Sequence, residues 1–345
     1  MKLIKTTDAV GATLCHDITR IVRGETKLPA FRKGHVVTES DIPLLLSLGK
    51  ENIYIWENEA GILHENDAAE VLCDICRGSN IERSEVKEGK IELSAQIDGL
   101  FKVNKEKMDE INALGQMIIA ARHGNFPVKA GDILAGMRII PLIIEESRMN
   151  AAKELCSGIP IMDVIPFNNK KVGIIITGSE ILHCRVKDAF TPVINEKLSE
   201  YGVDILKNIT LGDDHEMITK TCMEMIDSGM DFIICTGGMS VDPDDKTPLA
   251  IKNTGAEVVS YGAPVLPGSM FMIAYYGGEN IKIPIIGLPG CVIYAKRTIF
   301  DIVLPRIMAN DPICAKDITL LGHGGLCLSC SKCVFPNCGF GKAAL

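Results

Sequence analysis

The sequence predicts an α/β protein whose main domain has three layers: a parallel sheet with a mixed edge, covered by helices on both faces. Two observations support this fold class. Continuous apolar and β-branched runs occur after Pro166 at residues 172–176 and 232–235, and such runs are typical of strands buried on both faces, while residues 203–209 read as a further strand between them. Amphipathic segments lie between the runs, and strands that alternate with helices form parallel sheets.

The elements of this domain follow in order along the chain. A helix over residues 188–201 has one apolar face and is ended by Gly202. Asp213 or Asp214 caps the next helix, which ends at Gly229. The remaining elements are a helix with Thr247 as N-cap and Pro248 as its first residue, strands at 257–260 and 283–286, and an amphipathic helix at 298–308.

The sequence before Pro166 has short apolar stretches mixed with charge, which predicts small α+β or β modules. We expect helices at 39–48 and 64–77, and two strands joined by a Gly-Asp turn within 128–144. The expected domains are a first α+β module at 1–60, a second module with β segments at 61–165, the main α/β domain at 166–310 and a cysteine-rich tail at 311–345.

Composition excludes several classes of protein. Of the 345 residues, 47% are hydrophobic and 23% charged, which indicates a globular chain and excludes a disordered, collagenous or coiled-coil one. The net charge of -8 argues against general binding to nucleic acid or to an anionic membrane. The sequence contains no run of 18 apolar residues and no secretory h-region, so we expect a cytoplasmic protein with reduced thiols.

Four loops follow the predicted parallel strands, after Ile176, Ile209, Cys235 and Ile286. They read TGSE, TLGDD, TGGMSVDPDD and GLPG, and each is rich in glycine, carboxylate or hydroxyl groups. Ligands of parallel sheets bind outside the carboxyl ends of the strands. We therefore expect the four loops to meet at one edge and to bind a charged small molecule.

Each loop also has a purely structural interpretation. The glycines at 237–238 bring backbone N–H groups close to an anion, or only make a tight turn. The acids of the third loop suggest Mg²⁺ between them and that anion. Glu180 binds a metal, accepts a ligand hydrogen bond or caps a turn, and Asp213 and Asp214 serve equally well as helix caps. The GLPG loop is either part of the site or only a connection.

Together the motifs TGSE at Thr177, TGGMSVDPDDKT at Thr236 and GLPG at Gly287 resemble the molybdopterin-binding domain of molybdopterin molybdenumtransferases and adenylyltransferases, and are more similar to the molybdenumtransferase branch. The resemblance covers residues 171–306. It implies a pterin dithiolene whose phosphate or adenylate lies along the glycine loops. It also implies Mg²⁺-assisted insertion of molybdate with release of AMP, and a homodimer.

The resemblance assigns roles residue by residue. It implies that Glu180, Asp214 and Asp245 are catalytic and hold Mg²⁺ against the phosphates, with Asp213 as the alternative to Asp214. The implied cofactor-binding residues are Thr177, Gly178, Ser179, Thr236, Gly237, Gly238, Ser240, Asp242, Gly287, Pro289 and Gly290. The family commonly has an acid where this chain has Ser179, and the transferase's C-terminal β-domain has no counterpart after Asn310.

Three functions are compatible with these features. The first is an enzyme of molybdenum cofactor biosynthesis similar to the molybdenumtransferase. The second, favoured by the missing acid and β-domain, is a non-catalytic carrier that delivers molybdopterin to a molybdenum hydroxylase, with the cysteine tail as its docking element. The third, ranked lower, is a nucleotide pyrophosphatase of the competence-damage type, which shares the sheet and a related Gly-Thr-Glu loop.

Thirteen cysteines require an explanation. Cys327, Cys330, Cys333 and Cys338 form C-x2-C-x2-C-x4-C, which favours zinc or an iron–sulfur cluster over a flexible reduced tail. A role in handling sulfur, or in contacting the recipient enzyme, is the alternative. The Cys73-x-x-Cys76 pair lies within a predicted helix and is interpreted as structural. The isolated cysteines are expected to be small buried hydrophobes, except Cys291, which follows GLPG and is expected to face the site. His215 and four other histidines show no ligand spacing, whereas His323 is either an extra metal ligand of the tail or an ordinary loop histidine.

Overall fold

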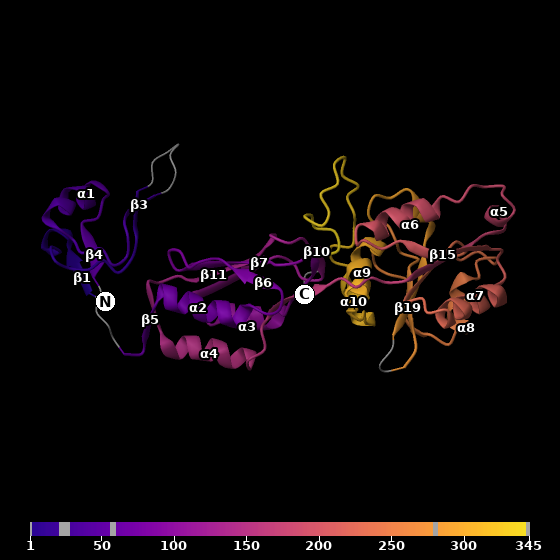
Figure 1. The fold of residues 1–345 in the computed structure, drawn as a ribbon, viewed down its shortest axis with the longest axis horizontal. Coiled ribbons are helices and arrows are strands. Elements are labelled where there is room, and N and C mark those ends of the chain that lie inside the picture. Colours follow the sequence, from indigo (N-terminus) through magenta and orange to yellow (C-terminus); the bar gives the residue numbers. More distant parts are fainter. Residues whose placement is uncertain (1, 21–27, 56–59, 279–281, 343–345) are drawn as a thin grey trace. The chain divides into compact units, whose positions relative to one another are not determined.

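The computed structural model describes residues 2–20, 28–55, 60–278 and 282–342 (Figure 1). The chain forms two compact units, each described here by itself. Unit 1 comprises residues 1–96, 103–122 and 130–163, and unit 2 comprises residues 97–102, 123–129 and 164–345. Within the described ranges, no helix is both long and apolar enough to cross a membrane.

Unit 2 is built around a six-stranded sheet with the strand order β15-β14-β16-β19-β18-β17. The strands are β14 (Val172–Thr177), β15 (Ile205–Leu211), β16 (Phe232–Thr236), β17 (Glu257–Tyr261), β18 (Met272–Tyr276) and β19 (Ile283–Leu288). The first four in spatial order are parallel, whereas β18 runs antiparallel to both β19 and β17. The predicted parallel sheet with a mixed edge is therefore confirmed.

Helices cover both faces of this sheet (Figure 1). They are α6 (Phe190–Ser199), α7 (His215–Asp227), α8 (Thr247–Asn253), α9 (Ile299–Met308) and α10 (Ala315–Leu320), while the four-residue α5 (Ser179–Leu182) lies in the loop after β14. Alternate residues of one strand serve different faces: Ile174 packs in a core with residues of α6 and α9, and Ile175 packs in a core with residues of α7 and α8. Burial on both sides explains why β14 reads as a continuous apolar run.

The predicted elements of unit 2 are confirmed with small shifts at their ends, but the prediction that the helix at 298–308 is amphipathic is wrong, because all ten residues of α9 are buried. The helix expected over residues 188–201 begins at Phe190, because the Asp188 carboxylate accepts hydrogen bonds from the first two backbone N–H groups. The helix expected to start after a Thr247 cap includes Thr247 itself, and Lys246 is the N-cap. The strand β18 and a short 3₁₀ helix after β19, η3 (Gly290–Ile293), were not predicted from the sequence.

Unit 1 holds several small antiparallel sheets. Its first part contains β1 (Lys2–Lys5) paired with β4 (Asn52–Ile55), β2 (Ile18–Arg20) paired with β3 (Leu28–Phe31), η1 (Thr6–Asp8), η2 (Glu39–Asp41) and α1 (Ile42–Ser47). The predicted helix at 39–48 is thus a 3₁₀ turn followed by a short α-helix.

The second part of unit 1 is a four-stranded sheet with helices packed against it. The strand order of this sheet is β6 (Ile81–Arg83), β7 (Lys90–Ala95), β11 (Ile133–Ile139) and β9 (Met117–Ala121). The helices are α2 (Glu65–Cys76), α3 (Lys105–Ala113) and α4 (Glu146–Cys156). A separate two-stranded sheet pairs β5 (Ile62–His64) with β12 (Ile143–Glu145). A further sheet, most of whose residues belong to unit 2, has the order β10 (Phe126–Val128), β8 (Gly99–Val103) and β13 (Met162–Pro166). Of the two strands expected within 128–144, the second is β11, which follows the turn at Gly131, whereas the first, β10, ends at Val128 and pairs with β8 in a different sheet.

Cys73 and Cys76 lie in the last turns of α2, and both are fully buried. Burial raises the pKa of both thiols. Redox pairs require a thiol at the start of a helix, where the helix dipole favours the thiolate. The structural interpretation of this pair is therefore confirmed.

Site-resolved alkylation tests this assignment. In the native, chelator-treated protein at pH 8, we expect Cys73 and Cys76 to react with iodoacetamide at least ~100-fold more slowly than the exposed thiols of Cys184 and Cys314, because buried neutral thiols are inert. Mass spectrometry of the digested protein measures each site, and all sites should react alike in denaturant. Equal rates in the native protein would show that α2 opens readily.

Candidate functional site

The four predicted loops begin at one edge of the sheet of unit 2, called here the rim. Strand register places Thr177 beside Leu211, Ile176 beside Thr236, and Thr236 beside Leu288. The carboxyl ends of β14, β15, β16 and β19 are therefore level with one another. The expected convergence of the TGSE, TLGDD, TGGMSVDPDD and GLPG loops is confirmed.

Threonine hydroxyl groups join the strand ends beneath the rim. The Thr247 hydroxyl donates to the Gly237 carbonyl at 2.8 Å and lies 3.0 Å from the Thr177 hydroxyl, which in turn donates to the Thr236 carbonyl at 3.4 Å. Thr236 donates to the Leu288 carbonyl across the next strand pair at 3.1 Å. All three threonines are buried. Thr177 and Thr236, expected to bind the cofactor, thus use their side chains to hold the rim together.

The glycine turn after β16 lies directly against the end of β14. A Cβ atom on Gly237, which has φ +90°, would lie 2.0 Å from the Thr177 carbonyl oxygen, so no other residue fits there. The following Gly238 also has positive φ. The Gly238 carbonyl accepts a hydrogen bond from the backbone N–H of Thr247 at 3.2 Å, which closes the loop on itself.

Glu180 and Asp245 lie over these adjacent turns. A Cβ atom on Gly178 would lie 2.9 Å from Glu180 Oε1, so this carboxylate folds back over the turn after β14. A Cβ atom on Gly238 would lie 3.6 Å from Asp245 Oδ1 and 3.2 Å from Thr177 Oγ1. Because β14 and β16 are hydrogen-bonded neighbours, the two carboxylates belong to one edge of the sheet.

The two acids after β15 have different surroundings. Asp214 caps α7, accepting hydrogen bonds from the backbone N–H groups of Glu216 and Met217. Asp213 is half-buried and accepts from both the backbone N–H and the hydroxyl of Ser179, at 3.1 and 2.9 Å. Asp213 therefore connects the first two rim loops, and the predicted catalytic residue Asp214 has the capping role that its sequence position also allowed.

The fourth loop is only partly at the surface. Gly287 is a buried residue within β19, where a Cβ atom would lie 2.4 Å from Met239 Cε, so its small size serves packing. Pro289 is half-buried and Gly290 is exposed, and both remain at the rim. Cys291 is half-buried, and burial raises the pKa of its thiol.

The acidic part of the third loop is open to solvent. Ser240 and Asp242 are exposed, and the Asp242 carbonyl accepts from the backbone N–H of Asp245 at 2.9 Å. Tyr261, which the sequence analysis missed, donates its hydroxyl to the Met239 carbonyl at 3.2 Å. Burial, with a smaller contribution from the charge of Asp245, raises the pKa of Tyr261. No local sequence signal marks this residue, because its contact is formed between distant segments.

His215 is a second residue that sequence reasoning did not assign. It is the first residue of α7, directly after the acids of the TLGDD loop. Its Nδ1 atom is buried, and among the described residues it has no hydrogen-bond partner. Buried polar atoms usually have partners, and this nitrogen is an exception among the described residues.

The residues that the structure describes contain no preformed metal-binding site. No three Asp, Glu, His or Cys side chains there lie close enough together to hold a metal ion. This applies to Glu180, Asp214 and Asp245 at the rim. It applies equally to the tail cysteines Cys327, Cys330, Cys333 and Cys338, which line a separate cavity together with residues 294–297.

Family comparisons agree with the motifs at the rim. Residues 173–309 match the family described as "Probable molybdopterin binding domain". Residues 3–57 match a family described as "Domain of unknown function (DUF8806)".

Curated relatives match only a short segment. The CinA-like protein of Mycobacterium avium (strain 104) is 36% identical over 77 residues, which is 22% of this chain and 18% of that protein. The CinA-like protein of Mycolicibacterium gilvum (strain PYR-GCK) is 40% identical over 78 residues, again 22% of this chain and 18% of that protein. The chain spans about a fifth of the length of the curated relatives it matches.

Solved structures similar to this chain include MoaB from Pyrococcus furiosus, described as a tungsten cofactor synthesizing protein, with 22% identity and a TM-score of 0.32 over 36% of this chain and 84% of that one. CinA from Thermoplasma acidophilum, described as of unknown function, has 17% identity and a TM-score of 0.33 over 40% of this chain and 98% of that one.

The family match and the rim motifs together identify residues 173–309 as a domain of the molybdopterin-binding family.

Proposed function

We propose that unit 2 binds molybdopterin, or its adenylate, at the rim and assists the insertion of molybdate during molybdenum cofactor biosynthesis. The observation that carries this proposal is the placement of two carboxylates, Glu180 and Asp245, over glycine turns at the ends of adjacent strands. Glycine turns let an anionic phosphate approach the backbone, and the acids beside them need a cation when that anion is bound.

Mg²⁺ is the cation that fits these residues. In phosphate sites it is usually held by one or two carboxylates together with phosphate oxygens, and it does not require a cage of protein ligands. Glu180 and Asp245 supply two carboxylates, and the described residues gather no larger set. When bound, Mg²⁺ would neutralise the phosphate charge and polarise its oxygens. Asp213 would keep Ser179 in place, and the threonine contacts would keep the turns rigid.

Substitution of Asp245 tests the proposal. We expect Asp245→Asn to weaken Mg²⁺-dependent retention of anaerobically prepared molybdopterin by at least ~10-fold, because a charge-assisted contact is worth roughly 1.5–3 kcal/mol. Retained pterin is measured by its fluorescence after oxidation, with and without Mg²⁺. If the protein inserts molybdate, AMP release from adenylated pterin should fall as well.

Asp204→Asn is the matched control, since Asp204 is an exposed acid that precedes β15 and so lies away from the carboxyl ends of the strands. It should retain pterin as the unmodified protein does. Equal losses in both variants, or no retention by the unmodified chain, would contradict the proposal. Hydrolysis of ADP-ribose or another nucleotide without retained pterin would instead support the nucleotide pyrophosphatase.

A carrier function is the second candidate, and one observation favours it. Asp214 is occupied as the cap of α7, and Ser179 occupies a position where the family commonly has an acid, so fewer carboxylates are free for catalysis. A carrier would retain pterin through Asp245, release no AMP and pass the pterin to a molybdenum hydroxylase. On the resemblance we also propose that the chain forms a homodimer, and on its sequence pattern that it works in the cytoplasm.

A further inference from the structure

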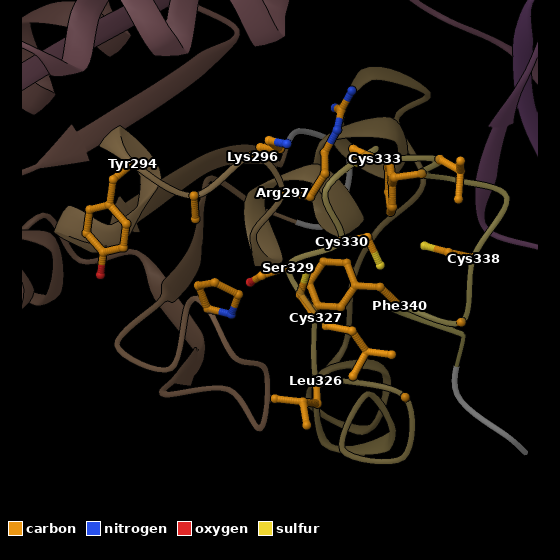
Figure 2. Close-up of a pocket in the computed structure, with 17 residues that line it drawn as sticks. Tyr294, Lys296, Arg297, Leu326, Cys327, Ser329, Cys330, Cys333, Cys338 and Phe340 are labelled. Carbon is orange, nitrogen blue, oxygen red and sulfur yellow. The ribbon is translucent and has the colours of Figure 1, made fainter.

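The tail cysteines are placed differently from most other thiols of the chain. Six cysteines are buried among apolar side chains: Cys15, Cys73, Cys76, Cys156, Cys222 and Cys235. In the tail, Cys330 and Cys333 are exposed, and Cys327 and Cys338 are half-buried. All four line one cavity of about 470 Å³ in unit 2 (Figure 2). These four thiols are therefore accessible and share one space.

Backbone hydrogen bonds anchor both ends of the segment that carries the four tail cysteines. Leu266 donates its backbone N–H to the Gly325 carbonyl and accepts from the N–H of Cys327, both at 2.8 Å. At the other end, the Gly341 N–H donates to the Gly324 carbonyl at 2.9 Å, and Phe340 is buried in the core of unit 2. The residues between these anchors form a closed loop, so the four cysteines stay near one another.

Two cationic residues border the cavity. Lys296 Nζ donates to the Ser331 carbonyl at 3.0 Å, and the Arg297 guanidinium lies over the Phe335 ring at 5.1 Å from its centre. Arg297 is already paired with Glu200 and Asp301, whereas Lys296 forms no ion pair within the described part of the chain. Lys296 therefore leaves a positive charge at the border of the cavity that no described carboxylate neutralises.

The loop has little regular structure of its own. Between residues 326 and 340 the structure contains no helix or strand, and the yellow segment in Figure 1 follows an irregular path beyond α10. Long irregular loops inside compact domains are uncommon unless they are functional, because ordering them costs conformational entropy. A metal ion bound by several thiolates supplies the cross-links that such a loop lacks.

We infer that Cys327, Cys330, Cys333 and Cys338 bind one thiolate-ligated metal centre, a zinc ion or an iron–sulfur cluster, in this cavity. Four thiolates around either centre leave a net negative charge, which Lys296 compensates. In the structure no three of the four thiols are close enough together to bind one metal ion. Metal binding therefore includes a rearrangement of the loop between its two anchors. This inference does not depend on pterin binding at the rim.

Metal analysis of the full-length, anaerobically purified protein tests the inference. One zinc per chain, or iron with acid-labile sulfide and visible absorption that dithionite bleaches, is expected. After removal of the metal, Co²⁺ serves as the probe, and tetrahedral thiolate coordination gives intense visible bands that Zn²⁺ abolishes. Cys330→Ser with Cys333→Ser should weaken Co²⁺ binding by at least ~100-fold, since loss of an outer-shell partner alone costs roughly 10–100-fold.

The control is the double variant Cys184→Ser with Cys314→Ser, which removes two exposed thiols outside the cavity. It should bind Co²⁺ as the unmodified protein does. A second measurement uses the unmodified chain: trypsin should cut after the exposed Lys332 more slowly when Zn²⁺ or the cluster is bound. Absence of thiolate bands under reducing conditions, equal binding by both double variants, or metal-independent cleavage after Lys332 would overturn the inference.

Discussion

Replacement of Asp301 by alanine is expected to lower the free energy of unfolding of unit 2 by about 3–5 kcal/mol, because removal of one partner leaves a buried charge uncompensated. The Asp301 side chain is 2% exposed and that of Lys197 is 8% exposed. Lys197 Nζ donates to both carboxylate oxygens, at 2.7 and 2.9 Å. Asp301 also accepts from the backbone N–H of Thr298 at 2.7 Å, which completes the N-terminal cap of α9.

Urea denaturation followed by circular dichroism measures this loss. Glu224→Ala is the matched control, because the Lys220–Glu224 pair is exposed and its atoms are 3.9 Å apart, and such pairs contribute about 0–1 kcal/mol. Replacing Asp301 and Lys197 together by apolar residues of similar volume should recover much of the stability. If Asp301→Ala costs no more than Glu224→Ala, the buried pair contributes little.

The same carboxylate organises the segment between the rim and the tail. Lys197 also donates to the Lys296 carbonyl at 3.1 Å, and Arg297 donates to Asp301 at 2.8 Å. Lys296 and Arg297 border the cysteine cavity, and they follow η3, which begins at Gly290 of the GLPG loop. Loss of Asp301 should therefore disturb the tail cavity as well as the helix cap.

The parallel strands β14, β16 and β19 were predictable because burial on both faces leaves a local mark, whereas the edge strand β15 has no fully buried residue. The strand β18 was not predictable, since its five apolar residues form a short run that fits a buried helix equally well, and its pairing with β17 and β19 is set by tertiary contacts. In unit 1, β7 does carry a local signal. Its residues alternate between exposed or half-buried and buried, in the sequence Lys-Ile-Glu-Leu-Ser-Ala, and this alternation was overlooked.

The position of the site was more predictable than the role of each residue in it. Strand order fixed where the loops meet, so Glu180 and Asp245 could be placed together from sequence. The roles of Thr177 and Gly287 could not, because their contacts are with Thr247 and Met239, which lie far away along the chain. Asp213 and Asp214 offered the same chemistry, and only the geometry shows which one caps α7.

Substitution of Gly237 by alanine is expected to lower the free energy of unfolding by about 2–5 kcal/mol and to abolish pterin retention. The backbone at Gly237 has φ +90°, and left-handed conformations cost other residues roughly 1–2 kcal/mol. In addition, the new Cβ atom would lie 2.0 Å from the Thr177 carbonyl oxygen, and forced overpacking typically costs about 1–3 kcal/mol. Relief of this clash must separate the ends of β14 and β16, the strands whose turns carry Glu180 and Asp245.

Gly255→Ala separates the two contributions. Gly255 also has positive φ, +80°, but a Cβ atom there would meet nothing within 4 Å, so it should cost only about 1–2 kcal/mol and leave pterin retention unchanged. Both variants are compared by urea denaturation, and retention is measured at a temperature where each is folded. Equal destabilisation by the two variants would mean that the ends of β14 and β16 move apart at little cost in free energy. A folded Gly237→Ala protein with undiminished retention would exclude the rim turn from the pterin site.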